Sequence, residues 1–524
     1  MNASTSQINS MSTSQLLRRF AIWSTAAFTS TLLIIFALNM YPAPDGDSIF
    51  FLPAIKAYAS NGIVENKLVD LSFETDPKRI GRFLFYTPGF PVALGSAMAI
   101  FHLTSYKGAL FLLSVIRTAS IFFFAKTLII TLEKRSLQTS LPCVLMASAL
   151  VFSSGLYLFP TNGRPEILSM LIVSASLLAS VSIGSRIIRN IVISIGIGLL
   201  FPVSIANGFI ACSFYLFYLL ADARRPATRI AFLALSLISG ACLIFLSYSA
   251  GGLPFADGLR GLSLHSKMQL GRTDTGLGLI LSYWKSWVVF AMLALAYLIS
   301  SFLNKSSPRV KSYSSLDWLW LAFSFAILAF SIYFFGLRAA PIHYNLYAFL
   351  PLYQFLAFQL IADSHACRSG FFQYLLWMLL AIGFSLSISE PLRAAALFPY
   401  YLFSGSTYSE AKNTFSGIDI GDCALMYTGG LTVLDDPQIG SQLKVDESSR
   451  AVLSKRIEAS GEKYKCVVAA IQEANSNSIA PTNMEKIADY GDISPWTAKL
   501  KALRLLNSPK GYSFKVYRQN LPFE

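Results

Sequence analysis

Apolar runs of about 20 residues recur through the first 404 residues, and a run of that length crosses a bilayer as one helix. The sequence has 524 residues, of which 54% are hydrophobic and 13% are charged. We therefore predict an α-helical polytopic membrane protein with about eleven transmembrane spans. The predicted spans lie near residues 20–40, 108–132, 139–158, 166–184, 190–204, 207–221, 229–250, 277–303, 314–335, 342–362 and 371–389.

The charges of the chain predict its orientation. Residues 1–404 contain 28 Lys and Arg but 14 Asp and Glu, whereas residues 405–524 contain 14 of each. The basic excess lies in short loops between predicted spans, as in membrane proteins, so nucleic acid is not an expected partner. The positive-inside rule then predicts that residues 1–19 are cytoplasmic and that the C-terminus lies outside. The predicted cytoplasmic loops carry Arg18/Arg19, Lys134/Arg135, Arg186/Arg189, Arg224/Arg225/Arg229, Lys305/Arg309/Lys311 and Arg368.

The first predicted outer loop, residues 41–107, contains two apolar stretches that we expect to lie along the membrane. Residues 51–59 form one apolar stripe with Lys56 opposite. The stretch 84–103 places Pro91 in a first helical turn. If this stretch crossed the membrane, every later loop would invert and the Arg-rich loops would face outward. We predict that it is a re-entrant or interfacial helix.

Two other segments interrupt the pattern of spans. Pro202 and Asn207 stand in the middle of the apolar region 186–221, which is too long for one helix, so we predict two short spans there. The segment 251–276 is Gly-rich and polar, and we predict a mobile outer loop with Asp257 as a solvated charge. The predicted transmembrane domain therefore covers residues 20–404.

The composition changes after residue 404, and strand-like runs alternate with polar helical stretches. The runs are 424–427, 466–471 and 512–517. This alternation predicts a small C-terminal α/β domain at residues 405–524 in the outer compartment. Cys423 and Cys466 both open predicted strands. An oxidising compartment would let them pair, and a buried unpaired arrangement fits the sequence equally well.

Three short segments on predicted outer loops carry residues suited to chemistry. These are Asp45 and Asp47 after the first span, Arg164 and Glu166 before the fourth, and Arg338, His343 and Tyr344 before the tenth. A carboxylate near a bilayer is costly to hold, so it indicates a functional site. Such a group can take a proton from an attacking hydroxyl. Arg side chains can hold a phosphate through paired hydrogen bonds. This combination favours group transfer from a phosphorylated lipid.

The acidic residues also have structural interpretations. Asp45 or Asp47 fits an N-cap of the following helix, since Asp is preferred there. Glu166 fits a structural ion pair with Arg164.

The basic residues have alternatives of the same kind. Arg338 fits an interfacial anchor whose stem lies in the membrane. His343 fits an interfacial histidine with satisfied hydrogen bonds. Arg117 lies near the middle of the second predicted span, where a charged side chain should face the bundle interior or a polar cavity.

These segments, taken in order over about residues 20–365, resemble the motifs of the GT-C superfamily of membrane glycosyltransferases. The resemblance is strongest to the branch with protein O-mannosyltransferases and the lipid A aminoarabinose transferase. The matching elements are Asp47-Ser48-Ile49-Phe50-Phe51, Tyr86-Thr87-Pro88-Gly89-Phe90-Pro91, Arg117, Arg164-Pro165-Glu166 and the segment from His343-Tyr344 to Pro351. The chain departs from the family at Ser48, where an acid is usual, and at Thr87, where a His is usual.

The resemblance implies an inverting transfer of one sugar from a polyprenyl-phosphate donor to an acceptor hydroxyl on a glycolipid, polysaccharide or protein. It places Asp47, Asp45 and Glu166 at the catalytic site, with Asp47 or Asp45 as the general base. It assigns substrate or phosphate binding to Arg117, Arg164, Arg338, His343, Tyr344 and Tyr86. No cofactor or metal ion is expected. The expected location is a bacterial inner membrane, with the active site and the C-terminal domain in the periplasm.

Two functions of other classes compete with this interpretation. A secondary transporter or lipid flippase would place charges at mid-bilayer on broken helices in related halves. The broken region 186–221 fits that loosely, but no second matching half is present in the sequence. A membrane scaffold whose outer domain binds a partner would make the acids of the outer loops dispensable.

Overall fold

The computed structural model describes most of the N-terminal half of the chain and parts of the C-terminal half. The described residues are 13–44, 48–66, 81–84, 86–134, 141–156, 163–222, 225–270, 347–366, 395–403, 407–428, 463–472, 484–490, 512 and 514–521, with a few single residues between them.

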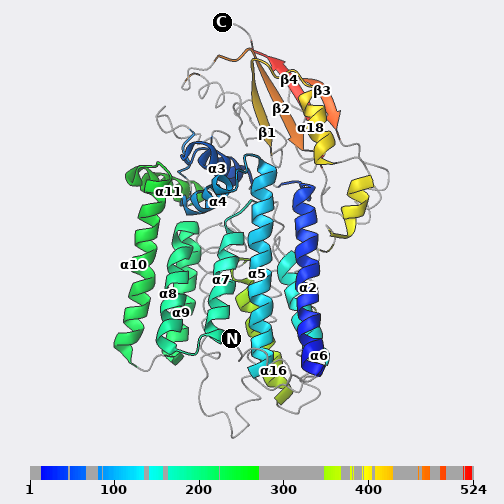
Figure 1. Ribbon diagram of the computed structural model, residues 1–524. Coiled ribbons are helices and arrows are strands. Elements are labelled where there is room, and N and C mark those ends of the chain that lie inside the picture. The colour runs from blue at the N-terminus through cyan, green and yellow to red at the C-terminus, as the bar shows by residue number, and fades with distance from the viewer. Residues whose placement is uncertain are drawn as a thin grey trace.

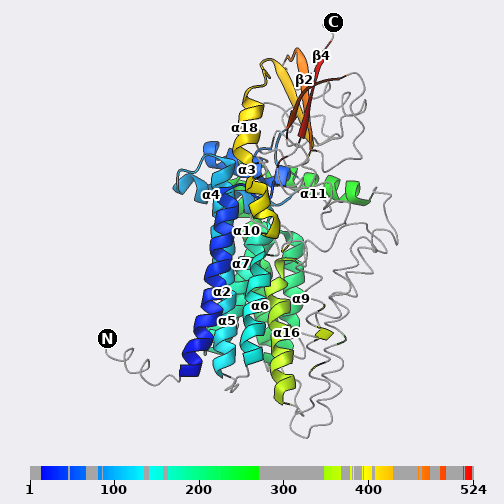
Figure 2. The ribbon, with the colours of Figure 1, turned by 90° about the vertical axis from the view of Figure 1, so that its right-hand side faces the viewer.

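Long apolar helices stand side by side and form a bundle (Figures 1 and 2). They are α2 (Thr13–Leu38), α5 (Tyr106–Lys134), α6 (Leu141–Leu156), α7 (Glu166–Ser182), α8 (Arg186–Val203), α9 (Ile205–Asp222), α10 (Pro226–Ala250) and α16 (Leu350–Ala366). Each lies at or near a predicted span. The spans predicted at 277–303, 314–335 and 371–389 fall almost entirely outside the described residues.

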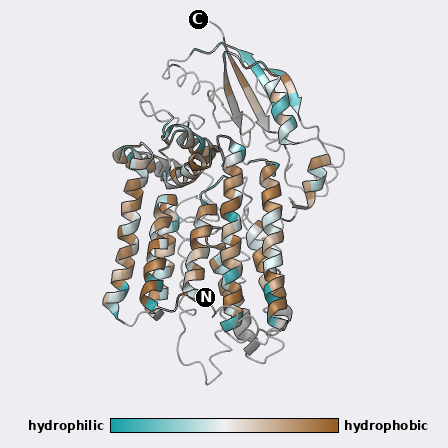
Figure 3. Cartoon of the chain, in the orientation of Figure 1, coloured by the Kyte–Doolittle hydropathy of each residue, from teal (hydrophilic) through white to brown (hydrophobic). Residues whose placement is uncertain are grey.

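Hydrophobic residues predominate along these helices, with polar residues interspersed (Figure 3). Four of the described helices, α2, α5, α8 and α10, are long and apolar enough to cross a membrane. Hydroxyl side chains within them bond to the preceding turn of their own helix, as Thr127 Oγ1 does to the Phe123 carbonyl at 2.8 Å. Such bonding suits a lipid environment, where each polar group must find its partner within the protein.

The predicted break between 186 and 221 is confirmed. Pro202 lies in the last turn of α8, Ser204 is extended, and α9 begins at Ile205. Phe201 fills the turn between the two helices. A Cβ atom added at Gly208 or at Gly240 would meet its ring at 2.5 Å. The two short helices therefore pack tightly where the proline stops the first.

Three shorter helices lie across one end of the bundle: α3 (Ser48–Asn61), α4 (Gly89–Ile100) and α11 (Phe255–Leu270) (Figure 1). A β-sheet lies beyond them, so we call this the sheet end and the opposite end the far end. The 12 residues of α4 extend for about 18 Å, at about 1.5 Å per residue, against a hydrocarbon core of about 30 Å. This length fits the expectation that 84–103 does not cross the membrane, which stays a prediction.

The prediction of a mobile loop at 251–276 is wrong for residues 255–270, which form α11. The glycines of this segment, which had indicated a loop, instead allow α11 to pack closely against its neighbours. A Cβ at Gly258 would meet the Tyr248 ring at 2.1 Å, and one at Gly261 would meet the Leu84 carbonyl oxygen at 2.3 Å. Asp257 also forms an ion pair with Arg82 at 3.6 Å. Helix α11 is thus fixed to the end of α10 and to the segment before α4.

The sheet has four strands in the order β1 (Cys423–Thr428), β2 (Cys466–Gln472), β4 (Phe514–Asn520) and β3 (Glu485–Tyr490). β1 and β2 are parallel, whereas β4 runs antiparallel to both β2 and β3. Helix α18 (Tyr408–Ser416) precedes it and begins with a capping box between Thr407 and Glu410. The strands expected at 424–427, 466–471 and 512–517 are present, the last of them two residues later. β3 was not predicted.

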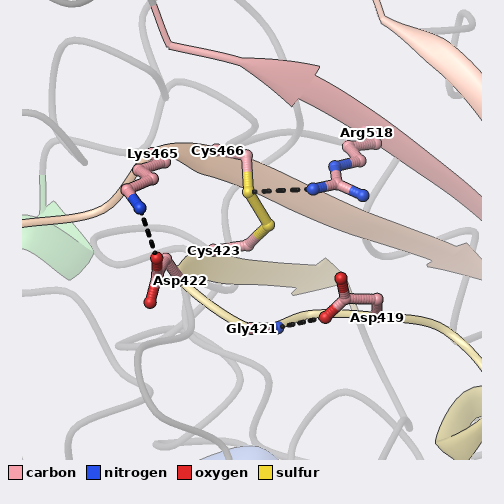
Figure 4. The surroundings of a disulfide bond; sticks show 7 residues. All are labelled: Asp419, Gly421, Asp422, Cys423, Lys465, Cys466 and Arg518. Carbon is pink, nitrogen blue, oxygen red and sulfur yellow. Dashed lines mark hydrogen bonds and ion pairs between the residues drawn. A yellow bond between two sulfur atoms is a disulfide. The ribbon is translucent and has the colours of Figure 1, made fainter.

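Cys423 and Cys466 form a disulfide bond between the first residues of β1 and β2 (Figure 4). The two positions are direct partners in the strand register, with Cα atoms 4.4 Å apart. An ion pair between Lys465 and Asp422, at 2.9 Å, lies beside the bond. Of the two arrangements that the sequence allowed, pairing is the one observed.

A cluster of aromatic side chains joins the sheet to the end of α2. The Tyr512 hydroxyl donates a hydrogen bond to the Met40 carbonyl at 3.1 Å. The Tyr41 ring lies 4.6 Å from Tyr401 and 5.1 Å from Phe398, between ring centroids. Burial raises the pKa of Tyr512 well above its usual value, with smaller effects from neighbouring tyrosines. These contacts join the C-terminal domain to the end of α2.

Candidate active site

The loop before α7 packs directly against the start of α3. Gly163 has φ +60°, a left-handed conformation that favours glycine, and a Cβ there would meet Leu52 Cγ at 2.9 Å. Leu52 is one turn from Ser48, the first residue of α3. The Arg164–Glu166 segment therefore lies next to the part of the chain that follows Asp45 and Asp47 in sequence.

Arg164 and Glu166 form a buried ion pair with two hydrogen bonds. Arg164 Nε donates to Glu166 Oε2 at 3.0 Å, and Arg164 Nη2 donates to Oε1 at 2.9 Å. Their side chains are 11% and 4% exposed. Glu166 also occupies the first position of α7, where the helix dipole favours a negative charge. The ion pair predicted as the structural interpretation is present, and both carboxylate oxygens accept from Arg164.

Tyr86 also packs against the start of α3. The Tyr86 ring lies 5.0 Å from Phe51 and 6.4 Å from Phe50, between centroids. The Asn66 amide donates to the Phe50 carbonyl at 2.8 Å. The sequence element that begins at Tyr86 therefore lies at the sheet end and packs against α3, as the Arg164–Glu166 loop does.

Arg117 lies deeper in the bundle and is fully buried. It stands eleven residues into α5, about 16 Å along the helix at about 1.5 Å per residue. Its Nε donates to the Gly155 carbonyl at 3.3 Å, and its Nη1 donates to the Met170 sulfur. Its Nη2 has no hydrogen-bond partner among the described residues. The prediction that Arg117 faces the bundle interior is confirmed, and its contacts link α5 to α6 and α7.

Two buried amides that the sequence analysis did not select as site residues lie within the bundle. Gln354 donates to Ser153 Oγ at 2.8 Å, joining α16 to α6. Asn207 donates to Ser169 Oγ at 3.1 Å, joining α9 to α7 one turn below Glu166. An amide within an apolar run usually forms a hydrogen bond to another helix rather than facing lipid. This rule could have identified both residues from the sequence. The Asn207 bond thus helps to fix α7, the helix that begins at Glu166.

The other predicted site residues lie outside the described part of the chain. They are Asp45, Asp47, Arg338, His343 and Tyr344. Pro44 and Ser48, the described residues on either side of the two acids, are both buried. Across the described ranges, no three His, Cys, Asp or Glu side chains gather as a metal site would require. The site described here thus consists of Tyr86 and the Arg164–Glu166 pair around the start of α3.

No family model and no curated protein matches this chain. Among solved structures, the oligosaccharyltransferase of Archaeoglobus fulgidus in complex with Zn and sulfate has a TM-score of 0.44 and 10% identity, covering 86% of this chain and 68% of that one. The Archaeoglobus fulgidus oligosaccharyltransferase AglB with an inhibitory peptide and a dolichol-phosphate has a TM-score of 0.46 and 11% identity, over 86% and 69%. Likeness at this level assigns neither a fold nor an activity to this chain.

Proposed function

We propose that this protein transfers a sugar from a polyprenyl-phosphate donor to an acceptor hydroxyl at the sheet end of the bundle, as a member of the GT-C superfamily. The main support is the packing of the Arg164–Glu166 loop and of Tyr86 on α3, whose first residue follows Asp47 in sequence. Tyr86 and the Arg164–Glu166 segment lie far apart in sequence and were both selected for their chemistry, and both pack on this one short helix.

In the proposed reaction, Asp47 is the general base and Asp45 supports it. The Asp47 carboxylate takes the proton of the acceptor hydroxyl as its oxygen attacks the anomeric carbon of the sugar. The bond between that carbon and the phosphate oxygen breaks, and the lipid phosphate leaves with the bonding electrons. Attack from the face opposite the leaving group inverts the anomeric configuration. The acceptor is a glycolipid, a polysaccharide or a protein.

Basic residues stabilise the negative charge on the departing phosphate. We assign this role to Arg164, together with Arg338 and His343. Glu166 is proposed to orient the Arg164 guanidinium rather than to take a proton, because both of its oxygens already accept from Arg164. Arg117 is proposed to hold α5 against α6 and α7 beneath this pair, since its guanidinium bonds to Gly155 and Met170. Tyr86 and Tyr344 complete the proposed substrate site.

Two independent features support a non-cytosolic location for the sheet end. The Cys423–Cys466 disulfide is typical of an oxidising compartment such as the periplasm. At the far end, α8 begins at Arg186 and α10 begins directly after Arg225, and such basic ends are typical of the cytoplasmic side. We therefore propose that the reaction takes place on the periplasmic face of a bacterial inner membrane.

The test is a transfer assay with purified protein, a polyprenyl-phosphate sugar and membrane acceptors. Removing a general base typically costs a factor of about 10²–10⁴, so Asp47→Asn should lose transfer by at least that range. Glu133→Gln is the matched control, because Glu133 is an acid at the far end, paired with Arg19 at 2.5 Å.

Full transfer by the folded Asp47→Asn variant would exclude this residue as the base. Solute uptake into vesicles without any sugar transfer would instead favour the transporter. Absence of sugar transfer by the wild-type protein, with partner binding unchanged in Asp45→Asn and Asp47→Asn, would favour the scaffold.

A further inference from the structure

Helix α2 ends in a turn that places a large residue in the left-handed conformation. Met40 has φ +53°. Its N–H donates to the Ala37 carbonyl at 3.0 Å, and the N–H of Tyr41 donates to the Phe36 carbonyl at 2.9 Å. This pair of hydrogen bonds is the Schellman motif, in which the left-handed position is usually occupied by glycine. A strained residue of this kind persists only where its surroundings hold it, and such residues gather near functional sites.

The side chain that bonds to this turn belongs to the C-terminal part of the chain. The Tyr512 hydroxyl donates to the Met40 carbonyl at 3.1 Å, across 472 residues of sequence. Tyr512 is 2% exposed and stands two residues before β4. Its ring packs on Tyr408 at 5.7 Å between centroids. The phenol is therefore fixed by the sheet and by α18, and it bonds the strained residue directly.

The chain that follows this turn is closely packed as far as Pro44, the last described residue before Asp45. Tyr41 is fully buried between Phe36, Phe398 and Tyr401. Pro42 and Pro44 follow and are also buried, and a proline fixes its own φ angle. A change in backbone direction at Met40 would therefore also displace the residues that follow it as far as Pro44. Asp47 stands seven residues after Met40.

We propose that Tyr512 is a positioning residue for the transfer reaction, because its hydroxyl fixes the turn that directs the chain from α2 to Asp47. The proposal rests on the proposed role of Asp47 as the base. It gives the C-terminal domain a function in the active site: Tyr512 supplies the hydrogen bond that holds the turn from which the first outer loop begins.

The test compares Tyr512→Phe with Tyr490→Phe in the full-length protein in lipid nanodiscs. Tyr490 is the matched control, because its hydroxyl also donates to a backbone carbonyl at 3.1 Å, but to that of Thr407 rather than that of Met40. A misplacement of about 1 Å can cost a factor of about 10² in rate, so we expect Tyr512→Phe to lower kcat by about 10- to 100-fold. The KM for the lipid donor should stay within twofold, and Tyr490→Phe should change neither value by more than twofold.

Equal effects of the two variants on kcat, or a rise in KM alone, would overturn the proposal. If Asp47→Asn is fully active, the proposed base is wrong whatever Tyr512→Phe does. If Asp47→Asn is inactive and Tyr512→Phe is normal, only the positioning role is wrong.

A second measurement applies even where Tyr512→Phe lowers the yield of folded protein. In an Asp47→Cys background, the rate of labelling by a membrane-impermeant thiol reagent is compared with and without Tyr512→Phe in the folded fraction. We expect a change of at least threefold, and an unchanged rate would overturn the proposal.

Discussion

The ion pair between Arg164 and Glu166 should be among the most sensitive contacts at the sheet end. Both side chains are nearly buried, at 11% and 4% exposure, and they share two hydrogen bonds. Removing one member of a buried pair leaves an uncompensated charge and costs about 3–5 kcal/mol. Glu166→Gln keeps the shape and one acceptor oxygen, so we expect a loss near the lower limit, about 3 kcal/mol. Replacing both residues by apolar side chains of similar size should cost less than either single change.

The assay is reversible unfolding in mixed micelles. It compares a single variant at Arg164, a single variant at Glu166, and the double variant in which both are replaced. The control is Glu133→Gln, since the Arg19–Glu133 pair is 41% and 35% exposed and such surface pairs contribute at most about 1 kcal/mol. The pair would be shown to be unimportant if Glu166→Gln cost no more than Glu133→Gln. Strict additivity of the single variants in the double variant would also refute the reasoning, because coupled residues are not additive.

Three further predictions follow from the packing and the chemistry of the described residues. Replacing Cys423 and Cys466 by Ser should destabilise the sheet by up to about 4 kcal/mol, because the bond closes a loop with a sequence separation of 43, and chemical unfolding measures this. Gly261→Ala should destabilise the fold by about 1–3 kcal/mol, since its Cβ would meet a backbone oxygen at 2.3 Å, whereas Gly184→Ala, with nothing within 4 Å, should be neutral in thermal unfolding. Burial raises the pKa of Tyr512, so the folded state keeps a proton that the unfolded state loses above about pH 10, and the stability measured across an alkaline series should fall above that pH.

Much of the helical bundle could be predicted from the sequence because bilayer thickness leaves few choices. The predicted placement of α4 along the membrane depended on charge as well as hydropathy, since its apolar run alone resembles a span. The error at α11 arose because Gly258 and Gly261 indicate a loop when read locally. Because these two glycines lack a Cβ, Tyr248 and Leu84 can pack closely against α11. That packing depends on tertiary structure.

The candidate site was predictable in part. The Arg164–Glu166 pair could be anticipated, because the two residues are two positions apart and opposite in charge. The packing of its loop against Leu52 and the hydrogen bond from Tyr512 to Met40 could not be predicted. Both contacts join segments that are far apart in sequence. Gln354 was missed because an isolated amide does not interrupt an apolar run, although its bond to Ser153 shows that it faces another helix.

The central claim is that Asp47 lies in a donor-binding site on the non-cytosolic side. Labelling of Asp47→Cys by a membrane-impermeant thiol reagent in intact cells, with other accessible cysteines replaced, tests it most directly. Gly184→Cys, at an exposed far-end position, marks the cytosolic side. We predict that Asp47→Cys is labelled from outside and protected by polyprenyl phosphate, and that Gly184→Cys is labelled only after permeabilisation. Labelling of both positions from the same side, or of residue 47 without any protection by the lipid phosphate, would contradict the account.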